Sequence, residues 1–255
     1  HLYIADTDNN RVLCWDDVEQ AFAGKPADKV LGQPDLHTNR DNSEDPHYAT
    51  LYSPTGLWVD DRGYLFVCDS SNNRVLVFKP PLYDDVIPDW IIGQSSYFEN
   101  DINAGGSVSE FGFDNPSHVL VKPDHTVYIS DQYNNRTLGF DDPIDPGKDS
   151  LADFVMGQPD FSSYFANQGS VSPNDSSQFY PAGLASDLEG NLWLSDSNNH
   201  RILMYPYPFS LTGDQSVVKL GQPDFASSYM NWDGVNNTDN FSGAYPSGLE
   251  LPEDI

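Results

Sequence analysis

The balance of charge is the first constraint on this 255-residue chain, because 39 Asp and Glu against 12 Lys and Arg give a formal net charge of −27. A surface this acidic repels phosphate backbones and anionic lipid headgroups, which argues against nucleic acid as a partner. The chain has no run of about 18 apolar residues, which argues against a membrane-spanning helix. A mean hydropathy of −0.52 with 19 Gly and 19 Pro is typical of a loop-rich, all-β protein.

The chain opens on a segment that occurs four times in all. Residues 1–15 contain an alternating apolar run, an Asp, a polar turn with Asn, and an Arg that begins a second apolar run. This pattern predicts two antiparallel strands joined by a tight connection. Similar segments follow at residues 64–78, 126–140 and 191–205. Their arginines, Arg11, Arg74, Arg136 and Arg201, lie 62 to 65 residues apart, which indicates a repeat architecture.

Each period is expected to contain two further short strands. One ends in Gly-Gln, and its copies lie at residues 29–36, 90–95, 154–161 and 218–225. The other has the form Pro-x-Gly-Leu, and its copies lie at residues 53–60, 115–121, 180–186 and 245–251. Four antiparallel strands per period predict the blade of a β-propeller.

We therefore expect residues 1–255 to form one all-β domain, a β-propeller with four blades of four antiparallel strands. Residues 245–255 are expected to complete the blade that residues 1–36 begin, so that ring closure between the N- and C-termini leaves no open edge. The further blades are expected at about residues 53–95, 115–158 and 180–222. Four repeats taken from a larger propeller would begin and end at the same points of the repeat. A segment of a larger propeller therefore remains an alternative.

These motifs resemble the NHL repeat. The shared pattern is Pro-x-Gly-Leu followed by Leu-Tyr-Val-x-Asp-x-x-Asn-Asn-Arg-Val, and the appended Gly-Gln-Pro-Asp-Phe segment is similar to a long-repeat variety found in bacterial proteins. The resemblance covers essentially the whole chain and implies a propeller fold. It leaves the function open, because NHL propellers include protein-binding and RNA-binding modules, extracellular receptor segments and a metal-dependent lyase.

The Asp and Asn residues of the hairpin turns have two interpretations. Their oxygens are the ligands that calcium prefers, so bound calcium is one of them. The other, which we favour, is that Asx side chains hydrogen-bond the turn backbone and tolerate positive φ. The arginines are expected to brace neighbouring strands through carboxylates and carbonyls. We assign no catalytic residue and expect no organic cofactor.

His118 is the candidate metal ligand. It stands where the other repeats have Gly56, Gly183 and Gly248, so it would place a titratable group in the central channel if that position faces the channel. The cysteines, Cys14 and Cys68, lie on hairpins of neighbouring repeats. They form either a disulfide or two buried thiols, and the sequence leaves both open.

The long loops after Gly-Gln supply the candidate ligand-binding residues. They contain Ser-Ser-Tyr-Phe twice and Ser-Ser-Tyr-Met once, and their aromatic candidates are Tyr97, Phe98, Tyr164, Phe165, Tyr229 and Trp232. Aromatic rings beside small polar residues suit a carbohydrate or protein surface. The alternative, which the repetition favours, is that the rings tuck under their own loops. Four sequons, at Asn135, Asn174, Asn236 and Asn240, are glycosylation candidates in a secreted protein.

Together these features favour a non-enzymatic extracellular or cell-surface scaffold. It would bind a protein or glycan through its loop face, or pack against copies of itself. The alternative is a metal-dependent lyase or hydrolase with a site at the propeller axis, using His118 and channel-facing carboxylates. A third interpretation is that the chain is one stretch of a longer surface protein or filament.

Overall fold

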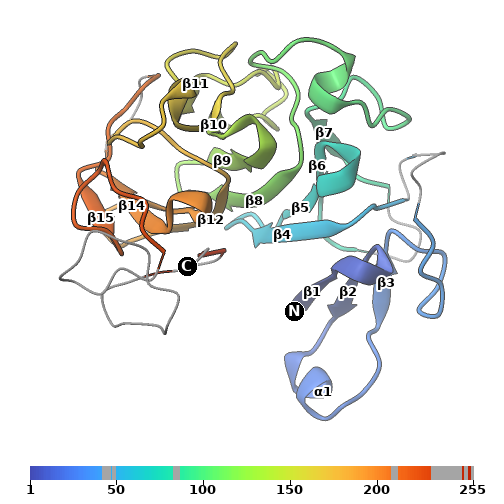
Figure 1. The fold of residues 1–255 in the computed structure, drawn as a ribbon. Helices are drawn as coiled ribbons and strands as arrows, with labels where there is room; N and C mark the ends of the chain where they lie inside the picture. Colours follow the sequence, from blue (N-terminus) through green and yellow to red (C-terminus); the bar gives the residue numbers. More distant parts are fainter. Residues whose placement is uncertain are drawn as a thin grey trace. The chain divides into compact units, whose positions relative to one another are not determined.

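Short antiparallel strands dominate the computed structural model (Figure 1). The structure describes residues 1–41, 47, 50–82, 87–207, 212–230, 249 and 252–253. Within that part of the chain, no helix is long and apolar enough to cross a membrane. The expected all-β architecture is confirmed.

The first sheet has three strands, in the order β1-β2-β3. They are β1 (Leu2–Asp6), β2 (Arg11–Trp15) and β3 (Lys29–Leu31). One short helix, α1 (Val18–Phe22), follows β2, and the Asp17 carboxylate caps it by accepting a hydrogen bond from the Glu19 N–H at 3.0 Å. A side-chain acceptor at this position satisfies a helix N–H that has no intrahelical partner.

Three further sheets have four strands each, in the orders β4-β5-β6-β7, β11-β10-β9-β8 and β12-β13-β14-β15. The hairpin strands, which the sequence predicts from their alternating pattern, are central in each. The bounds are β4 (Pro54–Val59), β5 (Leu65–Asp69), β6 (Arg74–Phe78), β7 (Trp90–Ile92), β8 (Pro116–Val121), β9 (Thr126–Asp131), β10 (Arg136–Asp141), β11 (Phe154–Met156), β12 (Pro181–Ser186), β13 (Leu192–Asp196), β14 (Arg201–Tyr205) and β15 (Val218–Leu220).

A short 3-10 turn joins the two strands of every hairpin and ends on a left-handed residue. The turns are η1 (Thr7–Asn9), η2 (Ser70–Asn72), η4 (Gln132–Asn134) and η6 (Ser197–Asn199). The left-handed residues that follow are Asn10, Asn73, Asn135 and His200, with φ between 51° and 55°. Asn tolerates this conformation better than most residues, which explains why it recurs at the position.

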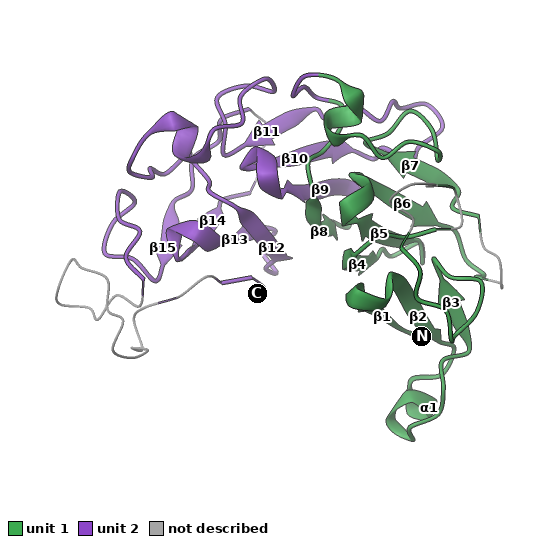
Figure 2. Cartoon of the chain, turned by 45° about the vertical axis from the view of Figure 1, so that its right-hand side comes forward, with its two compact units in different colours: residues 1–106, 111–123 green, residues 107–110, 124–255 purple. Residues whose placement is uncertain are grey.

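The chain divides into two compact units, which Figure 2 colours separately. Unit 1 comprises residues 1–106 and 111–123, and its core contains buried side chains from the first two sheets, among them Val12, Leu31, Val67 and Leu76. Unit 2 comprises residues 107–110 and 124–255, and its strands bury residues such as Ile129, Leu138, Leu194 and Leu203. The two remaining 3-10 segments are η3 (Ile102–Gly105) in unit 1 and η5 (Ala166–Gly169) in unit 2.

The described C-terminal residues lie beside β12 in unit 2. The N–H of Gly183 donates to the Glu253 carbonyl at 2.8 Å, and the Ser197 hydroxyl donates to the Pro252 carbonyl. In unit 1 the equivalent Ser70 hydroxyl donates to Pro116 at 2.7 Å. Pro252 therefore holds the place that the sequence pattern assigned to Pro246, which itself lies outside the described residues.

A large residue three positions before the proline explains why Pro252, and not Pro246, is equivalent to Pro54. Without a side chain, the glycine of each Gly-Gln pair leaves room for that residue. A Cβ on Gly32 would lie 2.6 Å from Leu51, and one on Gly221 would lie 2.8 Å from Leu249. Leu51 precedes Pro54 by three residues, as Leu249 precedes Pro252. Residues 245–249, Tyr-Pro-Ser-Gly-Leu, match the Pro-x-Gly-Leu motif of the other repeats. The motif alone therefore indicated Pro246, whereas the spacing from Leu249 indicates Pro252.

Candidate functional site

A carboxylate in each hairpin turn anchors a network of hydrogen bonds. Oδ2 of Asp69 accepts from Asn72 Nδ2 at 2.8 Å and from Arg74 Nε at 2.7 Å, and Oδ1 accepts from the Tyr52 N–H at 2.7 Å. The same three residue types are joined in Asp6–Asn9–Arg11, Asp131–Asn134–Arg136 and Asp196–Asn199–Arg201. These carboxylates are thus already engaged by N–H donors, which supports their structural interpretation.

Each arginine also ties its turn to a loop. Nη1 of Arg74 donates to the Tyr97 carbonyl at 2.7 Å, and Nη2 donates to the Thr50 carbonyl at 3.0 Å. In the other repeats Nη1 of Arg11, Arg136 and Arg201 donates to the carbonyls of Leu36, Phe161 and Phe225. The planar guanidinium can make these contacts together with the carboxylate contact. The predicted bracing role is confirmed.

The Gln of each Gly-Gln pair closes the long loop. Nε2 of Gln158 donates to the Asn135 carbonyl and to the Phe165 carbonyl, both at 2.9 Å. Gln33, Gln94 and Gln222 make the equivalent pair of bonds, to Asn10 and Arg40, to Asn73 and Asp101, and to His200 and Tyr229. Sequence reasoning identified the motif but missed this role, although an invariable Gln in four repeats was a signal for it.

These bonds determine which loop residues are equivalent. The arginine contacts the third residue after Gln, and the Gln side chain contacts the seventh. Tyr97 is therefore equivalent to Phe161, whereas Tyr164 and Phe165 are equivalent to Asn100 and Asp101. Although both loops contain Ser-Ser-Tyr-Phe, the main-chain contacts place the two copies three residues out of step.

The aromatic candidates accordingly have different environments. Tyr97 packs against the core of unit 1, and its hydroxyl donates to the Pro88 carbonyl at 3.1 Å. Burial, followed by the charge of Asp89, raises the pKa of Tyr97. Phe98 is exposed, Tyr229 is half-buried, and Trp232 lies outside the described residues. Tyr164 and Phe165 are exposed and stacked, with ring centroids 4.6 Å apart.

The sequon asparagines also differ. Asn135 is only 9% exposed, and its Nδ2 donates to the carbonyls of Tyr133 and Tyr164. Asn174 is half-buried, and its Oδ1 accepts hydrogen bonds from the N–H and hydroxyl of Ser176. Asn236 and Asn240 lie outside the described residues.

His118 lies half-buried on β8, and its use as a metal ligand stays a prediction. Among the residues with described positions, no group of three or more His, Cys, Asp or Glu side chains could hold a metal ion. Cys14 and Cys68 are both buried and free, so the structure agrees with the interpretation as two thiols. Burial raises the pKa of both, that of Cys14 to about 12.

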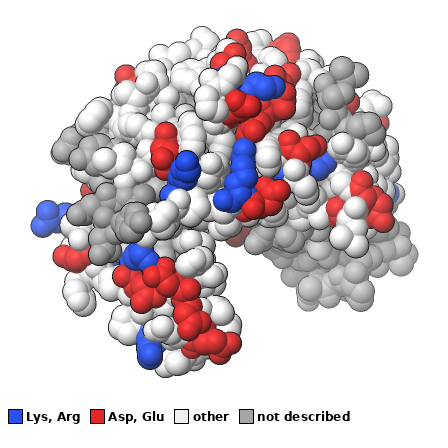
Figure 3. Space-filling model, turned by 180° about the vertical axis from the view of Figure 1, so that it is seen from behind, with Lys and Arg blue, Asp and Glu red and all other residues white. Residues whose placement is uncertain are grey.

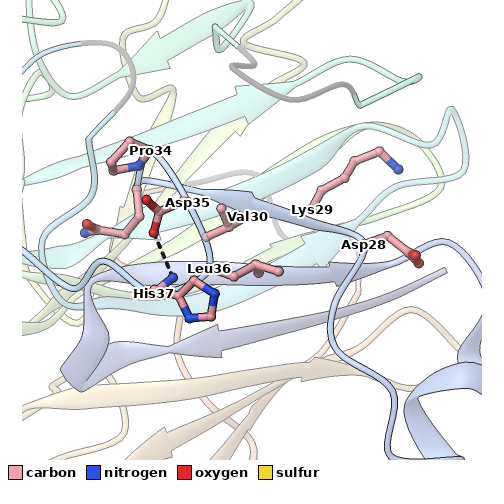
Figure 4. Close-up of a pocket in the computed structure, with 8 residues that line it drawn as sticks. Asp28, Lys29, Val30, Pro34, Asp35, Leu36 and His37 are labelled. Carbon is pink, nitrogen blue, oxygen red and sulfur yellow. Dashed lines mark hydrogen bonds between the residues drawn. The ribbon is translucent and has the colours of Figure 1, made fainter.

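Described residues of unit 1 line at least two hollows. The larger, about 810 Å³, has Tyr3, Cys14, Val59 and Leu82 among its lining residues, with the Lys29–Asp16 ion pair beside them. The smaller, about 330 Å³, lies along β3 and the loop after it (Figure 4). There the N–H of His37 donates to Asp35 Oδ1 at 2.8 Å. The larger hollow is lined by the Cys14 thiol together with His1 and Asp16, whose Nδ1 and Oδ1 lie 3.5 Å apart, but burial raises the pKa of that thiol to about 12 and keeps it protonated.

Acidic side chains outnumber basic ones on the surface. Figure 3 shows several clusters of Asp and Glu on one face, with Lys and Arg beside some of them. Several of the basic groups are paired, as in Lys148–Asp141 and Arg62–Asp60. A surface of this kind disfavours anionic ligands.

Comparison with known proteins bears on the fold. The NHL repeat model matches residues 51–78. The periplasmic gluconolactonase of Pseudomonas aeruginosa is similar with a TM-score of 0.50 and 12% identity, over 89% of this chain and 54% of that one. A Bacteroides thetaiotaomicron protein of unknown function has a TM-score of 0.51 and 12% identity, over 99% of this chain and 52% of that one.

The virginiamycin B lyase of Staphylococcus aureus is a looser match, with a TM-score of 0.39 and 14% identity over 69% of this chain and 44% of that one. The chain thus spans about half the length of these solved structures. No curated protein sequence matches it. Sequence identities this low bear on the fold that is shared, and they do not indicate a shared activity. The chain is an all-β protein of β-propeller type, with four blade-like sheets and an NHL repeat at residues 51–78.

Proposed function

We propose that this chain is a non-enzymatic binding or scaffold module that works outside the cell or at its surface. Its long blade loops would engage a protein or glycan, or copies of the chain itself. The observation that carries this proposal is that the repeated polar residues hold the structure together. Asp69, Asn72 and Arg74, with their equivalents, are committed to hydrogen bonds that hold turns and loops.

The loops provide the other support. Arg and Gln side chains hold the first part of each loop at two points, as Arg136 does at the Phe161 carbonyl and Gln158 at the Phe165 carbonyl. A main chain held in this way presents its side chains at low entropic cost, which favours binding. The cysteines give no support to nucleophilic chemistry, because burial raises their pKa and keeps them as neutral thiols.

Metal content and binding, measured on the same sample, test this function. We expect the purified chain to contain far less than one equivalent of Zn, Fe or Cu by mass spectrometry. We also expect it to bind a defined glycan on an array, or to self-associate in sedimentation velocity. Stoichiometric transition metal whose removal abolishes turnover of a lactone or peptide substrate would overturn the proposal in favour of the lyase or hydrolase.

A further inference from the structure

Three separate segments converge on the side chain of Asn135. Its Nδ2 donates to the Tyr164 carbonyl at 3.0 Å and to the Tyr133 carbonyl at 3.3 Å. Its Oδ1 accepts from the N–H of Tyr180 at 2.9 Å. One buried amide therefore holds together the main chains of the hairpin turn, the long loop and the segment before β12, all within unit 2.

The aromatic rings of these segments form two pairs. The Tyr133 and Tyr180 centroids are 5.2 Å apart with planes tilted by 30°, and the Tyr164 and Phe165 centroids are 4.6 Å apart with planes tilted by 27°. Tyr133 is 47% exposed, Tyr164 44% and Phe165 61%. The rings are thus fixed in position by the backbone beneath them, but present much of their surface to solvent.

The same frame carries mostly polar side chains in the other repeats, with Tyr229 as the one ring among the described equivalents. Asn10 and Asn73 accept from the N–H groups of Ser53 and Asn115, as Asn135 does from Tyr180. The residues equivalent to Tyr133 are Asp8, Ser71 and Asn198, those equivalent to Tyr164 are Asn39, Asn100 and Ser228, and those equivalent to Phe165 are Arg40, Asp101 and Tyr229. Rings needed for packing would recur with the frame. These do not recur as a set, so the fold does not require them.

Tyr180 also has an unusual backbone conformation. Its φ is +62°, in the left-handed region, whereas its equivalents with similar φ are Ser53 and Asn115. A bulky side chain is disfavoured in this region, and such outliers concentrate at functional sites. This position therefore has an aromatic ring where two other repeats have a small polar residue, Ser53 and Asn115.

We propose that Tyr133, Tyr164, Phe165 and Tyr180 form a platform that binds a neutral oligosaccharide, an inference that rests on the binding role proposed above. Aromatic faces stack on the apolar faces of sugar rings, and tyrosine hydroxyls bond to sugar hydroxyls. The net charge of −27 disfavours acidic saccharides. Three rings that are about half exposed and the partly buried Tyr180 offer roughly 350 Å². This area suits a few sugar units and is about half of what one side of a standard protein interface buries.

Calorimetric titration of the full chain with cellohexaose, mannohexaose and chitohexaose tests the platform. The variants take residues from equivalent positions, Tyr164→Asn and Phe165→Asp, so the main-chain contacts persist. We expect each to weaken binding of the preferred hexasaccharide by about tenfold or more, with an unchanged unfolding midpoint. Tyr164→Phe keeps the ring and should retain binding within a few fold. Phe22→Gln removes an exposed ring on α1 and should change nothing.

The outcomes separate the platform from the general binding role. Hexasaccharide binding that survives both polar variants would overturn the platform and leave a glycan-binding module standing. Binding of a protein or of further copies, with none of the three sugars bound, would overturn the saccharide class alone. Metal-dependent turnover without binding of any of these would overturn the proposed function itself.

Discussion

Nε of Arg74 lies 2.7 Å from Oδ2 of Asp69, and neither side chain is exposed to solvent. The equivalent contact between Arg11 and Asp6 has the same length, but those side chains are 16% and 25% exposed. Taking charges out of water is costly unless they are paired and hydrogen-bonded, so the same geometry has different consequences in the two repeats.

Removing the fully buried guanidinium of Arg74 should therefore cost more than removing the partly buried one of Arg11. We expect Arg74→Met to reduce the free energy of unfolding by about 3–5 kcal/mol, because Asp69 is left buried without its counter-charge. Arg11→Met should cost about 1 kcal/mol or less. Urea unfolding of both variants measures the difference, and equal losses would show that burial does not govern the contribution of this pair.

Adding a methyl group to β4 should test how closely the backbones approach. A Cβ on Gly56 would lie 2.6 Å from the Cα of His118 and 2.8 Å from the Ser117 carbonyl oxygen. We expect Gly56→Ala to destabilise the chain by about 1–3 kcal/mol, since backbone atoms cannot move aside cheaply. Gly106→Ala is the control, because there the nearest atom lies at 3.6 Å. Thermal unfolding of the pair checks this.

Local pattern was sufficient to predict the hairpins. Alternation, the Asn of the turn and the Arg after it all act within about fifteen residues, so tight turns such as Asp69 to Arg74 were readable. The glycine of Pro-x-Gly-Leu also recurs locally, and a Cβ on Gly56 would lie 2.6 Å from the Cα of His118.

Contacts between distant segments were not predictable in this way. The alignment of the loops depends on hydrogen bonds from Arg136 and Gln158 to carbonyls more than twenty residues away along the chain. Sequence similarity between the loops favoured a different alignment. The set around Asn135 comes from three segments, of which the sequence analysis singled out only Tyr164 and Phe165. Tyr133 and Tyr180 become candidates only when the structure brings them together.

Replacing the amide of Gln158 by a carboxylate should release its loop. Gln158→Glu keeps the shape of the side chain but removes the two donated hydrogen bonds to Asn135 and Phe165. We expect a loss of about 1–3 kcal/mol, with faster hydrogen exchange in residues 159–165. Gln20→Glu on α1 makes the same chemical change outside the loop and should leave both quantities almost unchanged.

Buried thiols should make stability fall at alkaline pH. Burial raises the pKa of Cys14 from 9.0 to about 12, and raises that of Cys68 as well. Between these values the unfolded chain loses thiol protons that the folded chain keeps, so stability decreases as pH rises above 9. The Cys14→Ala, Cys68→Ala double variant should show a shallower decrease. At pH 8 iodoacetamide should alkylate the thiols only in denaturant; rapid native alkylation would contradict their burial.

Glycosylation should distinguish the two described sequons. Asn135 Nδ2 is buried and already donates to Tyr133 and Tyr164, so a sugar on that nitrogen would have to displace a loop. Asn174 is more exposed, and its Oδ1 rather than its Nδ2 makes the bonds to Ser176. In a secreting eukaryotic host we therefore expect glycopeptides containing Asn174 and unmodified peptides containing Asn135. Asn174→Gln should remove one glycan mass, whereas a glycan found on Asn135 would show that its amide does not hold the three segments together.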